Sequence, residues 1–527
     1  MRSLLIWHPS RIRENGCEPL DSAGSDSALN AQRRTRELEQ LANGDSVDVL
    51  VIGGGITGVG VALDAVTRGL SVALVEKHDL AFGTSRWSSK LAHGGLRYLA
   101  SGNVGIARES AVERGILMTR TAPHLVRAMP QLVPLLPETS FFGKALVRTG
   151  FLAGDALRMS ARTPASVLPR SRTVSAARAR ELAPAVKQEN LRGALTAFDG
   201  QLIDDARLVV GIARTAASHG ARILARVGAY DVSGTSATLR DELTGSEFLM
   251  RARVVVNATG VWADQVDSSI TLRPSRGTHL VLDAARLGNP TAALTVPIPG
   301  ETNRFVFALP AQLGRIYLGL TDEAAPGPVP DVPSASEDEI DFLLDTVNTA
   351  LEVPLTRGDV LGTFAGLRPL LDTGEGSTAD LSRNHAVVRS DSGLVTVVGG
   401  KLTTYRKMAE DAVDAAVEVG SLSAGACRTR ALPLVGAASP AELKKIKAPA
   451  SLVARYGTEA EVVAAASGDR LRSVADLEIC GAEFDFAVSH EGALDVDDVL
   501  DRRTRIGLVA SDRERALGAA EQAFHSV

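Results

Sequence analysis

The chain has 527 residues, which is too long for one hydrophobic core and predicts two or three domains. Apolar residues make up 45% and charged residues 23%, as in ordinary globular proteins, and the formal net charge is −5 at pH 7. Binding along a nucleic-acid backbone needs concentrated Lys and Arg, so this charge balance excludes a broad nucleic-acid surface.

The cysteines and the apolar runs restrict the class of protein further. Cys17, Cys427 and Cys480 lie far apart without C-x-x-C spacing, so neither a disulfide framework nor a metal site is expected. No run of 18 or more apolar residues occurs, and we therefore expect no transmembrane helix. The first apolar run is too short for a signal peptide, so residues 1–27 are interpreted as a flexible polar tail of a cytoplasmic protein.

In chain order, the first predicted elements form a helix and a compact βαβ unit. Good helix formers over 28–44 predict a helix that ends at Asn43-Gly44. Residues 46–80 then predict a strand, a glycine-rich turn, a helix and a second strand. The first of these strands is nearly all apolar, which is typical of a buried parallel strand.

The middle of the chain predicts a change from helices to short strands. Residues 121–190 are rich in Pro, Leu and Arg and predict helices and loops. A helix and a strand are predicted over 204–224. Three short strands over 227–257 predict a meander that returns to the central sheet.

The second half predicts an antiparallel sheet followed by helices. Apolar and polar residues alternate in 277–285, 304–310 and 315–322, which predicts antiparallel strands with one face lining a cavity. Residues 393–420 predict a strand, a glycine turn and an amphipathic helix, and the chain from about 430 onward is predicted to be largely helical.

The glycine-rich turn carries a dinucleotide-binding pattern. Gly53, Gly55 and Gly58 form G-x-G-x-x-G between a strand and a helix, which permits a tight turn and a close approach to a pyrophosphate. The helix N-terminus offers free amide groups to the phosphates. Glu76, 18 residues after Gly58, ends the second strand, where a carboxylate can accept hydrogen bonds from a ribose.

Two later segments favour FAD over NAD as the dinucleotide. Ala258-Thr259-Gly260 ends a buried strand in a pattern typical of flavoproteins whose FAD domain is discontinuous. Gly399 and Gly400 lie at a second helix N-terminus, where backbone amides could polarise a flavin. No second G-x-G-x-x-G with a strand and an acid occurs, so we expect one FAD and no nicotinamide site.

These motifs together resemble one family. The chain is similar to the FAD-dependent glycerol-3-phosphate dehydrogenases, which are respiratory and NAD-independent, in "VIGGGITGVGVALDAVTRGLSVALVEKHDLAFGTSRWSSKLAHGGLRYL", "DDARLV", "NATGVWAD", "GLTD", "AGLRPLL" and "VVGGKLTTYRK". The resemblance is strong over about 46–430 and weaker in the C-terminal helical region.

The resemblance implies an α/β fold with a Rossmann-like FAD-binding domain made of discontinuous segments, an antiparallel-sheet substrate domain and a C-terminal helical domain. The expected divisions are a tail over 1–27, the interleaved FAD and substrate domains over 28–430, and the helical domain over 431–527. The substrate part is expected mainly in 121–190 and 276–355.

The resemblance also assigns a set of residues to the cofactor. In the family, the stretch 84–98 runs from the FAD pyrophosphate past the flavin to the substrate; the alternative is a polar loop whose serines cap a helix. The cofactor residues implied are Gly53, Gly55, Ile56, Thr57, Gly58, Glu76, Lys77, Thr84, Ser85, Ser88, Ser89, Lys90, Gly94, Gly95, Ala258, Thr259, Gly260, Gly399, Gly400, Leu402 and Thr403. Gly94 and Gly95 are expected to let the backbone pass close to the isoalloxazine ring.

A phosphomonoester substrate carries nearly two negative charges, so its site needs fixed cations. The resemblance assigns Arg97, Tyr98, Arg383 and Lys401 to the substrate phosphate. It places Arg368 near the reacting C2 hydroxyl. Taken singly, each of these cations could instead be a surface ion-pair partner.

Removal of the hydroxyl proton needs a base, and a neutral histidine suits that task. His93, next to the glycine pair, and His279, on a predicted strand of the substrate sheet, are the two candidates. Arg368 would then stabilise the developing alkoxide. The alternative for each histidine is a hydrogen-bonded structural role.

The resemblance implies oxidation of sn-glycerol 3-phosphate to dihydroxyacetone phosphate by hydride transfer from C2 to FAD, with electrons passed to a quinone. The alternatives are an oxidase that reduces O₂ to hydrogen peroxide, and a non-catalytic flavin-binding protein. Quinone use implies peripheral contact with the cytoplasmic face of the membrane, and a homodimer is a further expectation. Residues 132–159 could supply the membrane contact, but a buried helical pair is the favoured interpretation of that segment.

Overall fold

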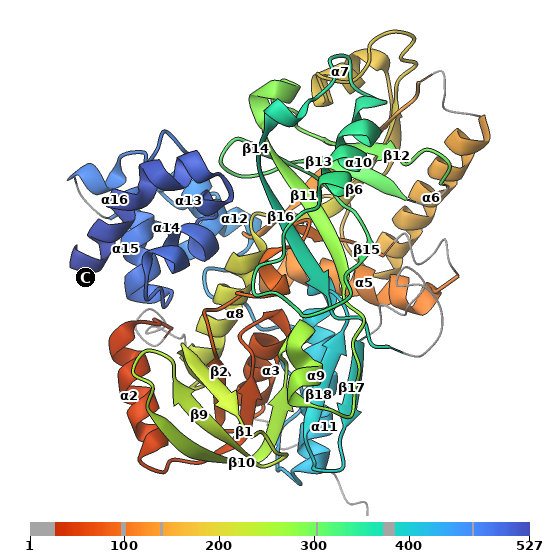
Figure 1. Ribbon diagram of the computed structural model, residues 1–527. Helices are drawn as coiled ribbons and strands as arrows, with labels where there is room; N and C mark the ends of the chain where they lie inside the picture. The colour runs from red at the N-terminus through yellow and green to blue at the C-terminus, as the bar shows by residue number, and fades with distance from the viewer. Residues whose placement is uncertain are drawn as a thin grey trace, which may run out of the picture.

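The computed structural model describes residues 27–95, 102–136, 141–301, 304–372, 385–465 and 468–526. Figure 1 shows three parts: a lower lobe around the glycine-rich turn, an upper lobe of antiparallel strands, and a cluster of C-terminal helices. This is the predicted combination of an α/β lobe made of separate chain segments, an antiparallel-sheet lobe and a helical C-terminal region.

The lower lobe is built on an eight-stranded sheet in the order β17-β18-β10-β1-β2-β7, extended from β10 by β9 and β8. Its strands are β1 (Val47–Ile52), β2 (Val72–Glu76), β7 (Arg222–Ala225), β8 (Val227–Tyr230), β9 (Ser236–Asp241), β10 (Glu247–Asn257), β17 (His385–Arg389) and β18 (Val395–Gly399). The central strand β1 pairs in parallel with both β10 and β2 and is buried along nearly all its length, which explains its apolar sequence. The predicted meander is confirmed as β8, β9 and β10.

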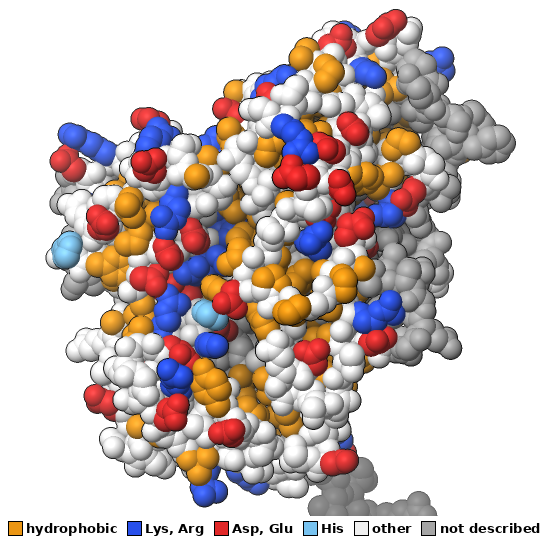
Figure 2. Space-filling model, in the orientation of Figure 1, with side chains coloured by type: hydrophobic (Ala, Val, Ile, Leu, Met, Phe, Trp, Pro, Cys, Tyr) orange, Lys and Arg blue, Asp and Glu red, His pale blue; other side chains and the backbone are white. Residues whose placement is uncertain are grey.

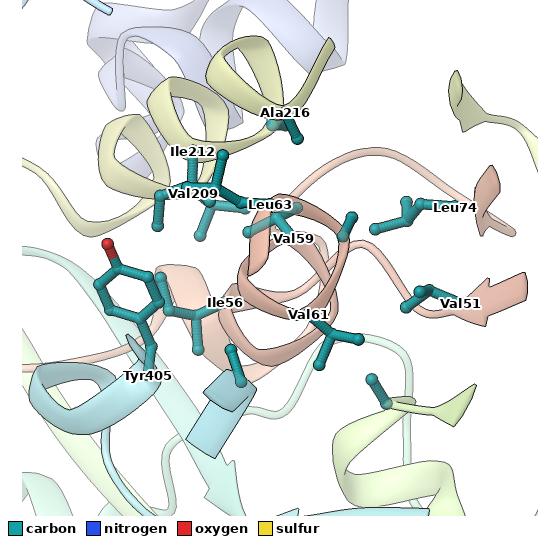
Figure 3. Packing of buried hydrophobic residues seen from close by; sticks show 14 of the residues in the cluster. Val51, Ile56, Val59, Val61, Leu63, Leu74, Val209, Ile212, Ala216 and Tyr405 are labelled. Carbon is teal, nitrogen blue, oxygen red and sulfur yellow. The ribbon is translucent and has the colours of Figure 1, made fainter. Parts of the chain in front are cut away.

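Helices cover both faces of this sheet. On one face lie α3 (Ile56–Thr67), α8 (Asp205–Ser218) and α11 (Tyr405–Val419). Figure 3 shows Val59 and Leu63 of α3 facing Val209 and Ile212 of α8. The opposite face is covered by α2 (Ala31–Ala42), which ends as predicted at Asn43-Gly44.

The upper lobe contains a ten-stranded sheet in the order β15-β11-β14-β13-β12-β4-β6-β3, with β16 paired to β11 and β5 to β6. Its strands are β3 (Leu91–Ala92), β4 (Val126–Pro134), β5 (Arg172–Val174), β6 (Ala194–Leu202), β11 (Ser275–Asp283), β12 (Ala293–Pro297), β13 (Phe305–Pro310), β14 (Arg315–Gly319), β15 (Glu323–Ala324) and β16 (Val360–Arg368). The antiparallel strands predicted over 277–285, 304–310 and 315–322 are confirmed as β11, β13 and β14.

The prediction of helices and loops over 121–190 is wrong at two elements, the strands β4 and β5. This segment contains the nine-residue strand β4, which pairs with β6 along its whole length. Pro130 and Pro134 made the strand look like a loop, because proline removes a backbone donor from a sheet. The helices of this lobe are α5 (Val104–Ile116), continued by a π-helical turn to Thr121, α6 (Phe141–Ser160), α7 (Ala176–Leu182) and α10 (Glu337–Asn348).

The C-terminal region is helical, as predicted. It comprises α12 (Pro440–Leu443), α13 (Ala450–Tyr456), α14 (Ala460–Ala464), α15 (Gly481–His490), a π-helical turn (Asp498–Arg503) and α16 (Ala510–Ser526). Its core includes Phe484, Leu500 and Ala520. Within the described ranges, no helix has both the length and the apolar character needed to cross a bilayer.

The remaining elements are short. A single turn of helix, α9 (Ala263–Val266), follows β10. The 3-10 turns are Thr84–Arg86, Gly260–Trp262, Ala284–Leu287, Arg357–Asp359, Leu402–Thr404, Gly457–Glu459, Gly468–Leu471 and Ile506–Leu508.

Candidate active site

A cavity of about 1270 Å³ lies between the two lobes, reaching from the glycine-rich turn to strands β11 and β16. Small-ligand cavities usually measure roughly 300–1000 Å³, so this one has room for a dinucleotide together with a small substrate. Of the residues assigned to the cofactor, those lining the cavity are Gly53, Gly55, Ile56, Thr57, Glu76, Lys77, Thr84, Ser85, Ser88, Ser89, Gly94, Ala258, Thr259, Gly260, Gly399, Gly400, Leu402 and Thr403.

The glycine-rich turn is packed so closely that side chains are excluded from it. Gly53 has a φ of +111°, and a Cβ there would lie 2.6 Å from the carbonyl oxygen of Ala258. Gly58 does not line the cavity; it packs against the turn, where a Cβ would collide with the carbonyl of Gly53. The tight turn expected at these glycines therefore has a direct steric basis, and so does the close packing of α3 at Gly58.

Glu76 and Ser85 hold the turn from two sides. The carboxylate of Glu76 accepts hydrogen bonds from the amides of Gly54 at 2.6 Å and His78 at 2.8 Å. Burial raises the pKa of Glu76, although these two amides favour the charged form. Ser85 Oγ accepts a hydrogen bond from the Ile56 amide at 2.8 Å, so this serine also serves the alternative role of a helix cap.

Other hydroxyls of the 84–90 segment also have protein partners. Thr84 donates to the carbonyl of Leu367 at 2.6 Å, and Ser88 donates to the Asp205 carboxylate at 2.7 Å. The hydroxyl hydrogens of both residues are therefore engaged by the protein, and the Ser88 oxygen also accepts the Lys90 amide at 3.0 Å.

The predicted position of Lys90 is wrong. It was expected near the cofactor, but its ammonium group is buried and donates to Asp205 at 2.9 Å and to the carbonyl of Arg86 at 2.8 Å. It does not line the cavity. A buried ammonium needs a carboxylate partner, and α8 supplies one in Asp205.

The role expected of the glycine pair is corrected at Gly95. Gly94 lines the cavity, where a Cβ would meet only the guanidinium group of Arg114, whereas Gly95 does not line it and a Cβ there would lie 2.9 Å from the Cα of Ala107. Gly95 is thus required by the close approach of α5.

His279 lies at the substrate end of the cavity on β11. Its side chain is 1% exposed, and its ring stacks on Phe364 of β16 with centroids 4.6 Å apart. Nε2 is 2.9 Å from Ser89 Oγ, while Nδ1 has no hydrogen-bond partner among the described residues. Burial, followed by the charges of Lys90 and Arg368, holds the pKa of His279 well below its usual value, so the ring is neutral at neutral pH.

Arg368 ends the neighbouring strand β16, which pairs with β11. Its guanidinium group donates to Asp322 Oδ1 and Ser275 Oγ, each at 3.0 Å, and to the Thr321 carbonyl at 3.2 Å. The sequence did not single out Asp322, Ser275 or Thr321. Their signal was visible only in part, since Thr321 and Asp322 belong to the quoted "GLTD" segment.

Two further predicted residues reach the same cavity. His93 is half-buried in its lining, directly after β3. Lys401 also lines it, and its Nζ donates to Ser110 Oγ at 2.8 Å. The cavity therefore brings His93, His279, Arg368 and Lys401 together, whereas Arg97, Tyr98 and Arg383 lie outside the described residues.

A second charged pair in the lining had no signal in the sequence. Arg114 Nη1 lies 2.6 Å from Asp199 Oδ1, and both residues border the cavity. Asp199 also accepts the amide hydrogen of Gly94 at 3.1 Å, and burial raises its pKa against the charge of Arg114. Arg304, also missed, lines the cavity and pairs with Glu301 at 2.7 Å.

Comparison with known proteins agrees with this geometry. Residues 48–406 match a family model described as FAD dependent oxidoreductase, and residues 427–525 match one described as the C-terminal domain of alpha-glycerophosphate oxidase. The chain is 65% identical over 506 residues to Glycerol-3-phosphate dehydrogenase 1 of Mycobacterium tuberculosis, covering 94% of this chain and 98% of the relative. The chain belongs to the FAD-dependent glycerol-3-phosphate dehydrogenase family.

Two other members of the glycerol-3-phosphate dehydrogenase family extend the comparison. The Mycobacterium leprae protein is 36% identical over 509 residues, covering 92% of this chain and 84% of its own. The structure of the Bacillus halodurans enzyme complexed with FAD superposes with a TM-score of 0.72 at 27% identity and 94% coverage of both chains.

FAD is the cofactor of this dehydrogenase family, and the residues present fit it. Gly53 and Gly55 of the tight turn line the cavity, the N-terminus of α3 borders it, and Glu76 lies at the end of β2. In the part of the chain that the structure describes, no group of three His, Cys, Asp or Glu residues is arranged to hold a metal ion.

Proposed function

We propose that the protein oxidises sn-glycerol 3-phosphate at C2 to dihydroxyacetone phosphate and passes the electrons to a quinone. The observation that carries this proposal is the neutral, buried His279 beside Arg368 at one end of a cavity whose other end is a dinucleotide turn. When bound, FAD supplies the two-electron acceptor for the hydride that leaves C2.

His279 acts as the base for the C2 hydroxyl proton. When the ring proton is on Nε2 and is donated to Ser89, Nδ1 carries a free lone pair that no described residue occupies. An imidazole with such a low pKa is a weak base by itself. The charge of a bound phosphomonoester opposes the effect of Lys90 and Arg368 and raises the pKa toward the working range.

Arg368 stabilises the alkoxide that develops at C2 as the proton leaves. Its hydrogen bonds to Asp322 and Ser275 fix the guanidinium plane, so little reorganisation is needed during the reaction. Lys401 offers a cation to the substrate phosphate from the opposite lobe. Arg97, Tyr98 and Arg383 are retained as proposed phosphate ligands on the resemblance alone.

The alternative of a non-catalytic flavin-binding protein does not account for His279. A buried ring nitrogen without a partner costs stability, and at His279, which lines the cavity, a substrate hydroxyl can supply the partner. The alternative of an oxidase depends on the electron acceptor, which the cavity residues do not distinguish.

Helix α6 supports a membrane-bound acceptor. One side of α6 lines the cavity through Phe151 and Arg158, while Leu152 and Met159 on the other side are 51% and 57% exposed. The remaining exposed residues among the described side chains of α6 are Ala145, Ala156 and Ser160, with Thr149 at the border of the cavity, so the described part of this outer face carries no charge. An uncharged helix face beside the cavity suits contact with a bilayer interface, from which a quinone would be drawn.

The favoured interpretation of 132–159 as a buried helical pair is wrong, because the segment contains the end of β4 and the single helix α6. In Figure 1, α6 lies at the edge of the upper lobe, away from the C-terminal helices. We therefore propose peripheral attachment through α6 at the cytoplasmic face. A homodimer is proposed from the resemblance alone.

The substrate is tested by anaerobic titration of the FAD-loaded protein. Addition of sn-glycerol 3-phosphate should abolish the visible flavin absorbance, whereas glycerol, which lacks the phosphate, should leave it unchanged. Bleaching by neither compound would contradict the proposed reaction.

The acceptor is tested by reoxidation of the reduced protein with a quinone in anionic liposomes and with O₂. We expect the quinone to be much faster, and Met159→Glu to remove the stimulation by liposomes without changing turnover with a soluble dye. Val353→Glu, at an equally exposed position outside α6, is the matched control. Equal rates with O₂, with one peroxide formed per substrate, would establish the oxidase alternative.

A further inference from the structure

The segment 79–90 of the lower lobe lines the cavity through its hydroxyls but is held from behind by buried charges. Asp79, Arg86 and Lys90 are 0%, 2% and 1% exposed. Because unpaired buried charges are costly, the partners of these groups fix the conformation of the segment. Several of these partners come from the C-terminal region, defined as residues 431–527 in our proposed division.

Arginines of the C-terminal region supply the first partners. Arg503 donates to both carboxylate oxygens of Asp79 at 2.8 Å, and Arg502 adds a third hydrogen bond at 2.6 Å. Figure 2 shows acidic and basic side chains gathered along the boundary between the C-terminal helices and the rest of the chain. The segment is thus anchored at its first end by the C-terminal region.

Arg505 anchors the other end of the segment. It is 2% exposed and donates to the Arg86 carbonyl at 2.7 Å, and its guanidinium group lies 5.0 Å from the centre of the Trp87 ring. The same Arg86 carbonyl accepts the Lys90 ammonium, which also bonds to the Ser88 carbonyl at 3.2 Å. Arg505 and Lys90 therefore hold one turn together through a shared acceptor.

This turn leads directly to the reacting end of the cavity. The residue between Ser88 and Lys90 is Ser89, whose hydroxyl is 2.9 Å from His279 Nε2. The Lys90 ammonium also lies 4.9 Å from the centre of the Phe364 ring, on which His279 stacks. A displacement of the turn would move both the hydrogen-bond partner of the imidazole and the charge beside it.

A second contact from the C-terminal region supports Phe364 itself. Val509 is 5% exposed and packs in one apolar cluster with Phe364, Tyr317 and Val281. The carbonyl of the preceding residue, Leu508, lies so close to β16 that a Cβ at Gly362 would collide with it. The C-terminal region thus touches both supports of the imidazole, the 86–90 turn and the ring of Phe364.

We propose that Arg505 and Val509 are positioning residues for His279, so that the C-terminal region sets the geometry of the proton-accepting site. This rests on the proposed function, because it takes His279 as the base. The charged groups near the imidazole are Lys90, on the turn that Arg505 holds, and Arg368, on β16. Removal of Arg505 leaves Lys90 paired with Asp205 but frees the 86–90 turn that carries it. A turn that moves away from Phe364 takes the Lys90 charge away from the imidazole, so that this charge lowers the pKa of His279 less.

The test compares Arg505→Ala with Glu459→Gln in the full-length FAD-loaded protein. Glu459 pairs with Arg214 of α8 at 2.7 Å, so its loss also breaks a buried ion pair at this boundary, away from the 86–90 turn. We expect Arg505→Ala to lower kcat by about 10- to 100-fold, with KM nearly unchanged, as for a misplaced reacting group. The acid limb of its kcat/KM profile should move to higher pH, and Arg505→Lys should restore part of kcat.

The possible outcomes distinguish failure of the positioning role from failure of the proposed function. If wild-type protein oxidises the substrate and His279→Gln does not, while Arg505→Ala and Glu459→Gln share one kcat and one pH profile, the positioning role is wrong. If wild-type protein does not oxidise the substrate, the proposed function itself fails. Should Arg505→Ala not fold, Val509→Ala keeps every ion pair and is expected to lower kcat without changing KM; a wild-type kcat for that variant would overturn the proposal.

Discussion

Two buried histidines show how position separates a chemical role from a structural one. His279 and His124 are 1% and 8% exposed, and in each Nδ1 has no hydrogen-bond partner among the described residues. Only His279 lines the cavity, where a substrate hydroxyl can reach it. His124 lies beside Gly436 at the start of the C-terminal region and is part of the packing.

The choice between the two candidate bases is therefore testable at single residues. His279→Gln should lower kcat/KM for sn-glycerol 3-phosphate by about 10²–10⁴-fold, the usual contribution of a general base, while FAD content is retained. His93→Gln, which alters the other candidate base in the cavity lining, is the matched control and should cost far less. The measurement is steady-state turnover with a soluble dye; a larger loss in His93→Gln would reverse the assignment.

His124 predicts how stability depends on pH. Burial lowers its pKa from 6.5 to about 3, so the unfolded chain binds a proton between these values that the folded protein does not. Stability therefore falls as pH drops below 6.5, by at most about 1.4 kcal/mol per pH unit.

His124→Gln should remove this loss of folding stability at low pH, because glutamine does not bind a proton. Between about pH 7 and about pH 5, the free energy of urea unfolding should fall by about 2 kcal/mol less in the variant than in wild type. Equal losses in the two proteins would show that His124 is not the group responsible.

At the scale of elements, the turn between β1 and α3 determines cofactor binding. Gly53 combines a φ of +111° with contact on the Ala258 carbonyl. Gly69, after α3, has a φ of +89° but no atom within 4 Å of a Cβ. The two glycines thus differ in their surroundings rather than in the sign of φ.

Gly53→Ala should abolish tight FAD binding, because the new methyl group forces the 53–55 turn away from the 258–260 segment. Gly69→Ala should cost only the backbone strain, about 1–2 kcal/mol, and keep its FAD. The measurement is the flavin-to-protein absorbance ratio after gel filtration, together with the midpoint of thermal unfolding. Retention of FAD by Gly53→Ala would contradict the role of this turn.

Sequence patterns predicted the elements whose structure depends on residues close together in the chain. The βαβ unit was predictable because β1 is apolar and its turn glycines are adjacent in sequence. The strand β4 was missed because its prolines resemble a loop, although β6 pairs with it about 65 residues later along the chain. Pairing with a strand that is distant in the chain leaves no pattern in the sequence of the strand itself.

The same distinction applies to the site. Lys90 was assigned to the cofactor because the resemblance places its segment along the FAD, yet its partner Asp205 is 115 residues away. The pairing of Arg114 with Asp199 was invisible for the same reason, since its residues are 85 positions apart. His279 and Arg368 could be nominated from the resemblance, but their relation depends on the pairing of β11 with β16.

At the scale of the whole molecule, all three parts of the chain contribute to the cavity or to its support. The lower lobe provides the glycine turn, the upper lobe provides His279 and Arg368, and the C-terminal region packs against the 86–90 turn and Phe364. Only this assembly places a neutral imidazole at one end of a cavity and a dinucleotide turn at the other. Chemistry at C2 of a phosphomonoester is the central claim that follows.

That claim is tested most directly by anaerobic single-turnover mixing of the FAD-loaded protein with sn-glycerol 3-phosphate, either unlabelled or carrying deuterium at C2. The account predicts that the visible flavin absorbance disappears, that deuterium slows its disappearance, and that His279→Gln slows it further without loss of bound FAD. If the absorbance persists, or disappears at one rate regardless of deuterium and of His279, then cleavage of the C2–H bond with the aid of this histidine is not the reaction of this protein.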